Sequence, residues 1–326
     1  MSVTSKIESF SKLNILVIGD VMVDAYYFGS VDRISPEAPV SIISVSQKDH
    51  RPGGAANVAL NLKSLGANAI ICAIIGNDEE GRELISLLNK EDINTEGLIT
   101  DASRPTTMKT RVISGSTHLL RIDHESTKPI SNATENQILD FVTNNITKVD
   151  AIIFEDYNKG LLTERLISEI ISIANKNNIP TIVDPKKENF FAYKKCTLFK
   201  PNRKEIQEGL KTDKDLSKII NIEEASTRLM EKLNCENLMV TLSEDGVFVK
   251  SASKSTHIKA HERKITDVSG AGDTVVSVAA LCLASGMELT QTAEIANIAG
   301  GLVCQKVGVV PINKNELIEE LLRLNI

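Results

Sequence analysis

The residues best suited to carry out chemistry form the stretch DVSGAGDT, residues 267–274. Gly270, Ala271 and Gly272 have almost no side chain, and the apolar run behind them predicts a buried helix. The free N–H groups and the positive dipole end of a helix start suit an anion such as phosphate. Asp273 would be a poor neighbour for phosphate unless it takes a proton from an attacking hydroxyl. The stretch therefore predicts phosphoryl transfer to an alcohol, with Asp273 as general base.

The same eight residues have a purely structural interpretation. A glycine-rich turn followed by an aspartate in the first helical turn is a favourable helix start in its own right. The stretch matches neither GxGxxG nor a phosphate loop that ends in Gly-Lys-Ser or Gly-Lys-Thr. On this stretch alone, capping and catalysis remain equal alternatives.

Composition and charge exclude several classes of protein. The 326 residues are 42% hydrophobic and 25% charged, and the net charge of −6 argues against a nucleic-acid surface. No apolar run reaches the roughly 18 residues of a membrane span, and the polar N-terminus lacks a signal-peptide core. The five cysteines show no CxxC spacing, so we expect buried, reduced thiols and a cytoplasmic protein with neither nucleic-acid nor membrane partners.

Buried strands alternate with amphipathic helices along the chain. This alternation predicts an α/β fold with a mostly parallel sheet and helices on both faces. The expected strands lie at 13–20, 68–76, 149–156, 179–185, 196–202 and 236–246, and the expected helices at 55–66, 79–90, 135–146, 162–178 and 222–234.

Two segments depart from this rhythm, at about 24–46 and 104–125. Both are rich in β-branched and aromatic residues and contain turn residues, such as the run Ser114-Gly115-Ser116. We expect each segment to form a β hairpin that leaves the main sheet and acts as a small lid. With no low-complexity linker in the sequence, we expect residues 1–326 to form a single domain with this lid.

Two distant motifs carry a family resemblance. RPGGAANVALNLKSLGA, residues 51–67, and DVSGAGDT resemble the N-terminal and C-terminal signatures of the ribokinase-like (PfkB) sugar kinases. NRKE at 202–205, TLSEDG at 241–246 and ANIAGG at 296–301 fit the same pattern. The resemblance implies a ribokinase-like three-layer α/β/α sandwich with a mostly parallel central sheet and a β-strand lid. It also implies ATP and Mg²⁺ as cofactors and a homodimer formed through the lid.

One subgroup of that family is most similar. ISPEAPV, residues 34–40, resembles the start of the D-glycero-β-D-manno-heptose 7-phosphate kinases, and EDYNKGLLT at 155–163 and DPK at 184–186 agree with it. This resemblance implies phosphorylation of the anomeric hydroxyl of a heptose 7-phosphate to the 1,7-bisphosphate, a step towards ADP-heptose for the lipopolysaccharide core. The subgroup often carries a fused adenylyltransferase. Because the sequence ends at Ile326, we expect a stand-alone kinase with an adenylyltransferase and a phosphatase on separate chains.

Two alternatives stay open. Another sugar or sugar-phosphate kinase of the same fold would use the same machinery, although the string at 34–40 speaks against it. A non-catalytic sugar- or nucleotide-binding regulator could keep the fold, but it would have no need for Asp273.

The resemblance implies roles around the acceptor sugar. Asp273 is the base, and residues 270–273 form the anion hole. The carboxylates of Asp20 and Asp24, on a loop after the first strand, are expected to accept hydrogen bonds from sugar hydroxyls. The sugar would also contact Gly53, Gly54 and Asn57.

The resemblance also implies a nucleotide site. Asn202 and Glu205 would lie near the ATP phosphates and hold Mg²⁺ through water, although their spacing equally fits a capping box. Arg203 and Lys204, between them, would face the nucleotide or the solvent. The remaining candidates for ATP binding are Thr241, Gly246 and Asn297.

The distal phosphate of the substrate needs cations, and arginine can hold a phosphate through two parallel hydrogen bonds. We favour Arg111, Arg121 and Lys159, and we expect both arginines to point inward when the lid closes. The wider set of candidates also includes Arg33 and Lys109.

Overall fold

The structure is a computed structural model that describes residues 3–115 and 117–326. Its body is built on a nine-stranded sheet in the order β13-β12-β11-β10-β9-β8-β1-β4-β5. Pairing is parallel throughout except at one edge, where β12 pairs antiparallel with both β11 and β13. The strands are β1 (Asn14–Gly19), β4 (Asn68–Ile75), β5 (Asn94–Thr100), β8 (Ala151–Glu155), β9 (Thr181–Asp184), β10 (Leu198–Phe199), β11 (Asn237–Thr241), β12 (Val247–Ser251) and β13 (Ser255–Ile258).

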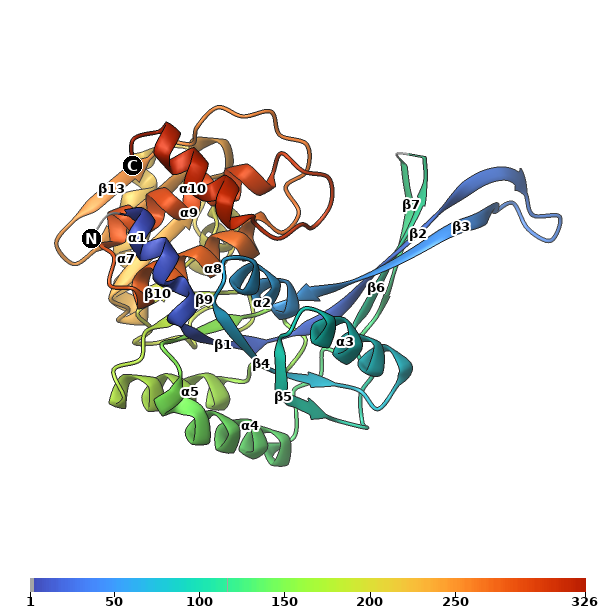
Figure 1. Cartoon of the computed structure of the whole chain (residues 1–326), viewed down its shortest axis with the longest axis horizontal. Helices are drawn as coiled ribbons and strands as arrows, with labels where there is room; N and C mark the ends of the chain where they lie inside the picture. The colour runs from blue at the N-terminus through green and yellow to red at the C-terminus, as the bar shows by residue number, and fades with distance from the viewer. Residues whose placement is uncertain (1–2, 116) are drawn as a thin grey trace.

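Helices cover both faces of this sheet. Figure 1 shows α2 and α8 on one side of the central strands and α4 and α5 on the other, which gives three layers. The central strands are apolar along their length because both of their faces are buried. The helices are α1 (Val3–Glu8), α2 (Ala55–Ser64), α3 (Glu79–Lys90), α4 (Asn132–Asn145), α5 (Glu164–Lys176), α6 (Arg203–Leu210), α7 (Ile219–Leu233), α8 (Ala271–Ala284), α9 (Leu289–Val303) and α10 (Lys314–Arg323), with 3₁₀ turns at Ser9–Lys12, Ile146–Lys148 and Ser243–Asp245.

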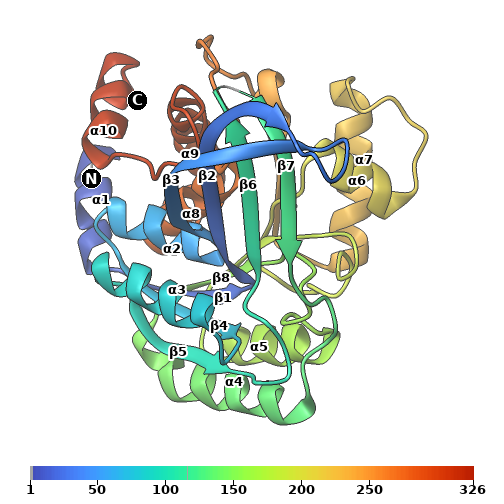
Figure 2. The same cartoon turned by 90° about the vertical axis from the view of Figure 1, so that its right-hand side faces the viewer.

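A second sheet of four strands, in the order β3-β2-β6-β7, forms the lid. Both predicted hairpins are present, since β2 pairs antiparallel with β3 and β6 with β7. The two hairpins are joined by parallel pairing of β2 with β6. Figure 1 shows this sheet extending away from the body, and Figure 2 shows its strands face on. The strands are β2 (Val21–Ile34), β3 (Ser41–Gly54), β6 (Met108–Ser114) and β7 (Thr117–His124).

Three details differ from the sequence-based expectations. Asp20 and Asp24 do not share a loop, because Asp20 alone separates β1 from β2, and β2, which begins at Val21, contains Asp24. The strand expected at 196–202 is reduced to Leu198–Phe199. Ser116, part of the expected hairpin turn, lies outside the described residues.

Two expectations from composition can be compared with the structure. All five cysteines are free and buried, as predicted. Within residues 3–115 and 117–326, no helix combines the length and the apolar character needed to cross a membrane.

Candidate active site

Three neighbouring strands deliver charged side chains to one edge of the main sheet. Glu155 is the last residue of β8, Asp184 is the last residue of β9, and Lys200 follows β10 directly. The carboxyl ends of adjacent parallel strands lie side by side and form the usual ligand site of such sheets. Asp273, in the first turn of α8, reaches the same place. Carboxylate oxygens of Glu155, Asp184 and Asp273 lie within 4.8 Å of one another.

Asp273 is held by two side chains from different parts of the chain. Asn57 Nδ2 donates to Asp273 Oδ2 at 2.6 Å, and the Tyr157 hydroxyl donates to Oδ1 at 3.1 Å. Asp273 is only 8% exposed. Burial raises the pKa of Asp273 to about 6, although the hydrogen bond from Asn57 opposes the shift. A fixed carboxylate with a raised pKa is suited to accept a proton near neutral pH.

The glycine-rich stretch leaves space above these carboxylates. Gly270 is the N-cap of α8 and has φ +78°, a left-handed conformation that suits glycine. A Cβ on Gly272 would lie 3.6 Å from Asp184 Oδ2 and 3.9 Å from Lys200 Nζ, so the missing side chain keeps the site open. Together with Ala271, these residues present the first turn of a helix, whose N–H groups lack intrahelical partners. The backbone N–H groups at the start of α8 therefore lie close to the Asp184 carboxylate and the Lys200 ammonium group.

Glu155 has an environment that suits a cation. Both of its carboxylate oxygens are buried, and neither is hydrogen-bonded to any described residue. Burial, followed by the charges of Asp184 and Asp273, raises the pKa of Glu155 well above its usual range. Asp184 differs, because the charges of Lys200 and Lys186 outweigh its burial and lower its pKa. The orphaned oxygens beside two further carboxylates fit Mg²⁺, which prefers oxygen ligands.

Asn202 and Glu205 form the capping box that the sequence left open as an alternative. Asn202 Oδ1 accepts the Glu205 N–H at 2.9 Å, and Glu205 Oε2 accepts the Asn202 N–H at 2.8 Å. The other carboxylate oxygen, Glu205 Oε1, accepts from Lys186 Nζ at 3.0 Å. Thr241 lies beside Asn202 through an isolated β-bridge. The capping role is therefore present, and contact of these residues with nucleotide or metal remains a prediction.

Four further nucleotide candidates have structural roles or solvent contacts. Arg203 forms an ion pair with Asp245, and Lys204 is exposed. Gly246 turns the chain between β11 and β12 with φ +89°. Asn297 Nδ2 donates to the Lys259 carbonyl at 3.0 Å.

On the acceptor side, Asp20 anchors a loop. Its carboxylate accepts backbone N–H bonds from Tyr157 at 2.9 Å, Lys159 at 3.0 Å and Leu161 at 3.4 Å. Burial raises the pKa of Asp20 to about 6. The same loop carries the Tyr157 hydroxyl to Asp273. Asp20 thus helps to place Tyr157, a role that the sequence did not suggest.

Asp24 and Arg111, two predicted substrate groups, bind each other. Arg111 Nη1 lies 2.5 Å from Asp24 Oδ1. A Cβ on Gly53 would lie 2.2 Å from Asp24 Oδ2, so only glycine allows the carboxylate to lie there. Gly54, with φ +61°, precedes α2 and leads to Asn57. Asn57 Oδ1 is buried without a hydrogen-bond partner in the described chain, which leaves an acceptor for a sugar hydroxyl.

The other predicted phosphate cations are paired elsewhere. Arg121 donates through Nε and Nη2 to Asp123 at 2.8 and 2.9 Å and is 56% exposed, so its side chain lies along its own strand. Lys159 Nζ donates to Glu125 at 2.7 Å. Of the three favoured cations, Arg111 is the one whose charged group contacts an amino acid predicted to bind the sugar, Asp24.

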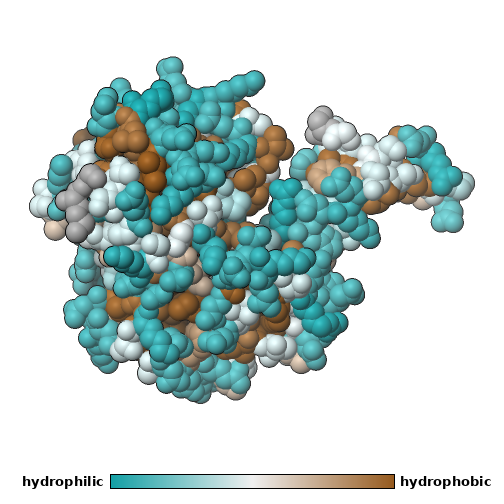
Figure 3. All heavy atoms as spheres, viewed as in Figure 1, coloured by the Kyte–Doolittle hydropathy of each residue, from teal (hydrophilic) through white to brown (hydrophobic). Residues whose placement is uncertain are grey.

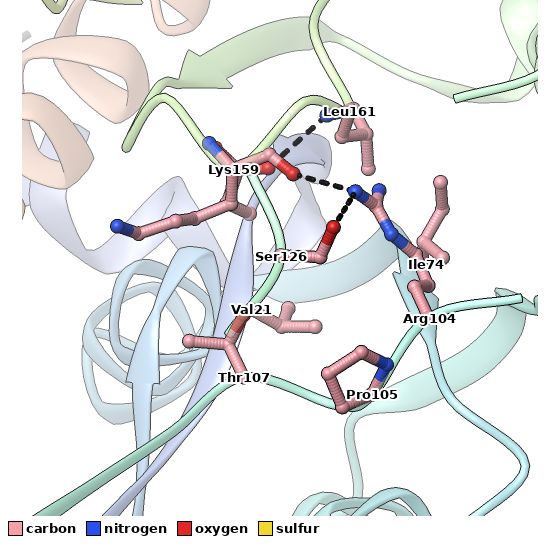
Figure 4. A pocket seen from close by; sticks show the side chains of 9 residues that line it. Val21, Ile74, Arg104, Pro105, Thr107, Ser126, Lys159 and Leu161 are labelled. Carbon is pink, nitrogen blue, oxygen red and sulfur yellow. Dashed lines mark hydrogen bonds between the residues drawn. The ribbon is translucent and has the colours of Figure 1, made fainter. Parts of the chain in front are cut away.

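Figure 4 shows a small pocket beside Asp20, lined in part by Arg104, Thr107 and Lys159. Arg104 Nη2 donates to the Lys159 carbonyl at 3.1 Å and to Ser126 Oγ at 3.4 Å. The guanidinium thus holds neighbouring loops together at the base of the lid.

The sequence motifs alone assigned no role to five polar residues at or just beyond the ends of β8, β9 and β10. Glu155, Tyr157, Asp184 and Lys186 stood in quoted motifs, and Lys200 stood in an expected strand. A usable signal was present, since an acidic residue closes each of two apolar strands.

Comparisons with known proteins agree with this geometry. The family model described as pfkB family carbohydrate kinase matches residues 12–315. The bifunctional protein HldE of Pelobacter propionicus is 38% identical over 97% of this chain, and that of Rhodopseudomonas palustris is 40% identical over 95%. The chain spans 65% and 63% of the length of these two relatives.

Solved structures share the architecture. The phosphofructokinase-2 of Escherichia coli in complex with potassium aligns with a TM-score of 0.81 at 19% identity, over 96% of this chain and all of that one. The same enzyme in complex with fructose-6-phosphate gives a TM-score of 0.77 at 18% identity over the same shares. The predicted ribokinase-like fold is confirmed. This chain belongs to the pfkB family of carbohydrate kinases.

Proposed function

We propose that the chain transfers the terminal phosphoryl group of ATP to the anomeric hydroxyl of D-glycero-D-manno-heptose 7-phosphate. The observation that carries the chemistry is the buried Asp273 carboxylate at the open start of α8, beside Glu155 and Asp184. The hydroxyl proton passes to Asp273 as the sugar oxygen attacks phosphorus, and the bond from phosphorus to the bridging oxygen breaks to leave ADP.

The surrounding residues serve this transfer. Asn57 and Tyr157 hold the Asp273 carboxylate in one orientation, and the first turn of α8 offers N–H groups to the charge on the moving phosphoryl group. Glu155 and Asp184 would hold Mg²⁺, with Asn202 and Glu205 contributing through water. When bound, Mg²⁺ neutralises phosphate charge.

The choice of heptose 7-phosphate rests on the string at residues 34–40, which lies at the far end of the β2–β3 hairpin. The relatives named HldE support the same choice. Arg111 is the cation best placed for the distal phosphate, because its guanidinium forms an ion pair with Asp24, which we expect to bind the sugar. Binding there would require the phosphate to share or replace this ion pair.

A coupled ADP-release assay over a panel of sugar phosphates tests the proposal. We expect heptose 7-phosphate to give the highest kcat/KM, and Asp273→Asn to abolish most turnover with every sugar. Preference for fructose 6-phosphate would overturn the substrate while leaving the chemistry. No turnover with any sugar, under conditions where ATP binds, would overturn the chemistry as well.

We also propose that residues 1–326 form a single cytoplasmic kinase domain that assembles into a homodimer through its lid. Large apolar side chains lie exposed on the lid, and Figure 3 shows apolar patches along this arm. Exposed apolar clusters of this kind mark association surfaces. Sedimentation should give a dimer that Ile122→Lys weakens, with Ile220→Lys on α7 as the matched control. The exposed lid residues are Val31, Ile34, Val40, Val45, Leu119, Leu120 and Ile122.

A further inference from the structure

Lys186 is a partly exposed cation at the active site that the steps above do not use. Its ammonium lies 3.0 Å from Glu205 Oε1 and 3.8 Å from Asp184 Oδ1. It also lies 5.4 Å from the centre of the Tyr157 ring. The side chain is 32% exposed, so a ligand can reach it.

These neighbours place Lys186 between the two halves of the site. Glu205 belongs to the capping box of α6, on the proposed nucleotide side. Tyr157 belongs to the acceptor side, because its hydroxyl donates a hydrogen bond to the proposed base, Asp273. A group that moves from nucleotide to sugar must pass between these two sides.

Lys200 provides a comparison. Its ammonium lies 2.8 Å from Asp184 Oδ2, and its side chain is only 4% exposed. Lys200 therefore serves as a buried counterion for one carboxylate. Lys186 has a looser setting, since its contacts are a hydrogen bond to Glu205, a long one of 3.4 Å to the Pro185 carbonyl and a wider ion pair with Asp184. An ammonium group has three donors, and only the contacts with Glu205 and the Pro185 carbonyl are hydrogen bonds, so one donor forms no hydrogen bond among the described residues.

The charge balance explains why such a cation is needed. Four carboxylates, Glu155, Asp184, Glu205 and Asp273, surround the site, and two ammonium groups contact them. Phosphate brings further negative charge into a place where burial strengthens repulsion. A bound metal removes part of that repulsion. A lysine with a free donor removes more of it and adds a directional hydrogen bond.

We propose that Lys186 is a catalytic residue that binds the terminal phosphoryl group of the nucleotide during its transfer, through the ammonium donor that forms no hydrogen bond among the described residues. This inference rests on the proposed phosphoryl transfer. Lys186 stays protonated throughout and neither gives nor takes a proton. Its part is to stabilise negative charge on the phosphoryl oxygens as the bond to ADP breaks and the bond to the sugar oxygen forms.

Nucleotide binding without sugar tests this directly. Isothermal titration with AMP, ADP and a non-hydrolysable ATP analogue, each with Mg²⁺, should show that Lys186→Met weakens the ATP analogue at least ~10-fold while AMP binds as in the wild type. Lys186→Arg should recover most of the loss, because it keeps the charge. Lys187→Met, at the exposed neighbouring lysine, should bind all three nucleotides like the wild type.

Steady-state kinetics give a second reading. Loss of a group that stabilises charge in the transition state should lower the kcat of Lys186→Met by roughly 10²-fold or more. Unchanged affinity for the ATP analogue in this variant would refute the inference. Equal weakening of AMP and the ATP analogue would also refute it, since that pattern indicates a purely structural role. If Lys186→Met does not fold, Lys186→Gln takes its place under the same criteria. A wild-type protein that binds no ATP analogue would instead refute the proposed function.

Discussion

Replacing Asp273 with asparagine should make the empty protein more stable at neutral pH while it removes activity. Asparagine has nearly the same shape, keeps an oxygen for Asn57 Nδ2 and places an amide near Tyr157 and the Glu155 carboxylate. Loss of the base should lower kcat at least ~10²-fold. The stability gain follows from the burial of a charge.

The magnitude comes from the pKa of Asp273, which burial raises from the usual 3.8 to about 6. Because the folded state holds the proton more tightly than the unfolded state, stability falls as pH rises from 3.8 to about 6 and stays low above it. A difference of this size corresponds to about 3 kcal/mol in the free energy of unfolding. Asparagine does not carry this cost.

Urea denaturation of the metal-free protein at pH 8 and at pH 4 measures the effect. We expect Asp273→Asn to exceed the wild type by up to about 3 kcal/mol at pH 8 and by much less at pH 4, where Asp273 is largely protonated. Asp92→Asn, at a side chain that is 88% exposed, controls for the loss of one carboxylate. A variant that is less stable than the wild type at pH 8, or shifted equally at both pH values, would show that burial of Asp273 is not costly.

Three further substitutions, the first with a comparison variant, test the arrangement around the site. Arg111→Ala leaves the Asp24 carboxylate buried without its partner, so we expect the free energy of unfolding to fall by roughly 3 kcal/mol and the KM for a phosphorylated sugar to rise. Arg121→Ala, at an exposed ion pair, should lower the free energy of unfolding by at most about 1 kcal/mol. Equal effects of the two substitutions would contradict the different burial of these arginines. Gly270→Ala forces a side chain into φ +78° and should lower stability in urea by about 1–2 kcal/mol together with kcat, and an unaffected variant would show that the helix start tolerates a Cβ. Asn202→Ala removes the cap of α6 at a cost of about 1 kcal/mol, and an unchanged KM for ATP would limit Asn202 to capping.

The sequence predicted the elements that depend on local pattern. Apolar runs between helical segments predicted the main sheet, and β-branched segments with turn residues predicted both lid hairpins. The start of α8 was also predicted from a local pattern, because glycines followed by a long apolar run favour a turn that leads into a buried helix. Asp273 could be selected because its motif combines a helix start with an acidic residue.

The contacts of the site that the sequence did not predict depend on pairing between strands far apart in the chain. Arg111 reaches Asp24 only because β2 pairs in parallel with β6, which aligns residues 85 positions apart, such as Asp24 and Lys109. A hairpin turn fixes the register of its own two strands and says nothing about a neighbouring hairpin. Glu155 and Asp184 meet for a similar reason, because β8 and β9 are adjacent in the sheet. An acidic residue at the end of one strand does not show which other strand will lie beside it in the sheet.

Three buried acids of the site, Asp20, Asp273 and Glu155, differ in how the fold compensates their charge. Backbone N–H groups satisfy Asp20, and side-chain donors satisfy Asp273, so both keep fixed positions without a ligand. Glu155 has no described donor on either oxygen, and its neighbours include two further carboxylates. An uncompensated acid beside open space is stabilised by whatever supplies positive charge, whether a proton or a metal ion. Glu155 should therefore be the residue through which cation binding changes the stability of the whole fold.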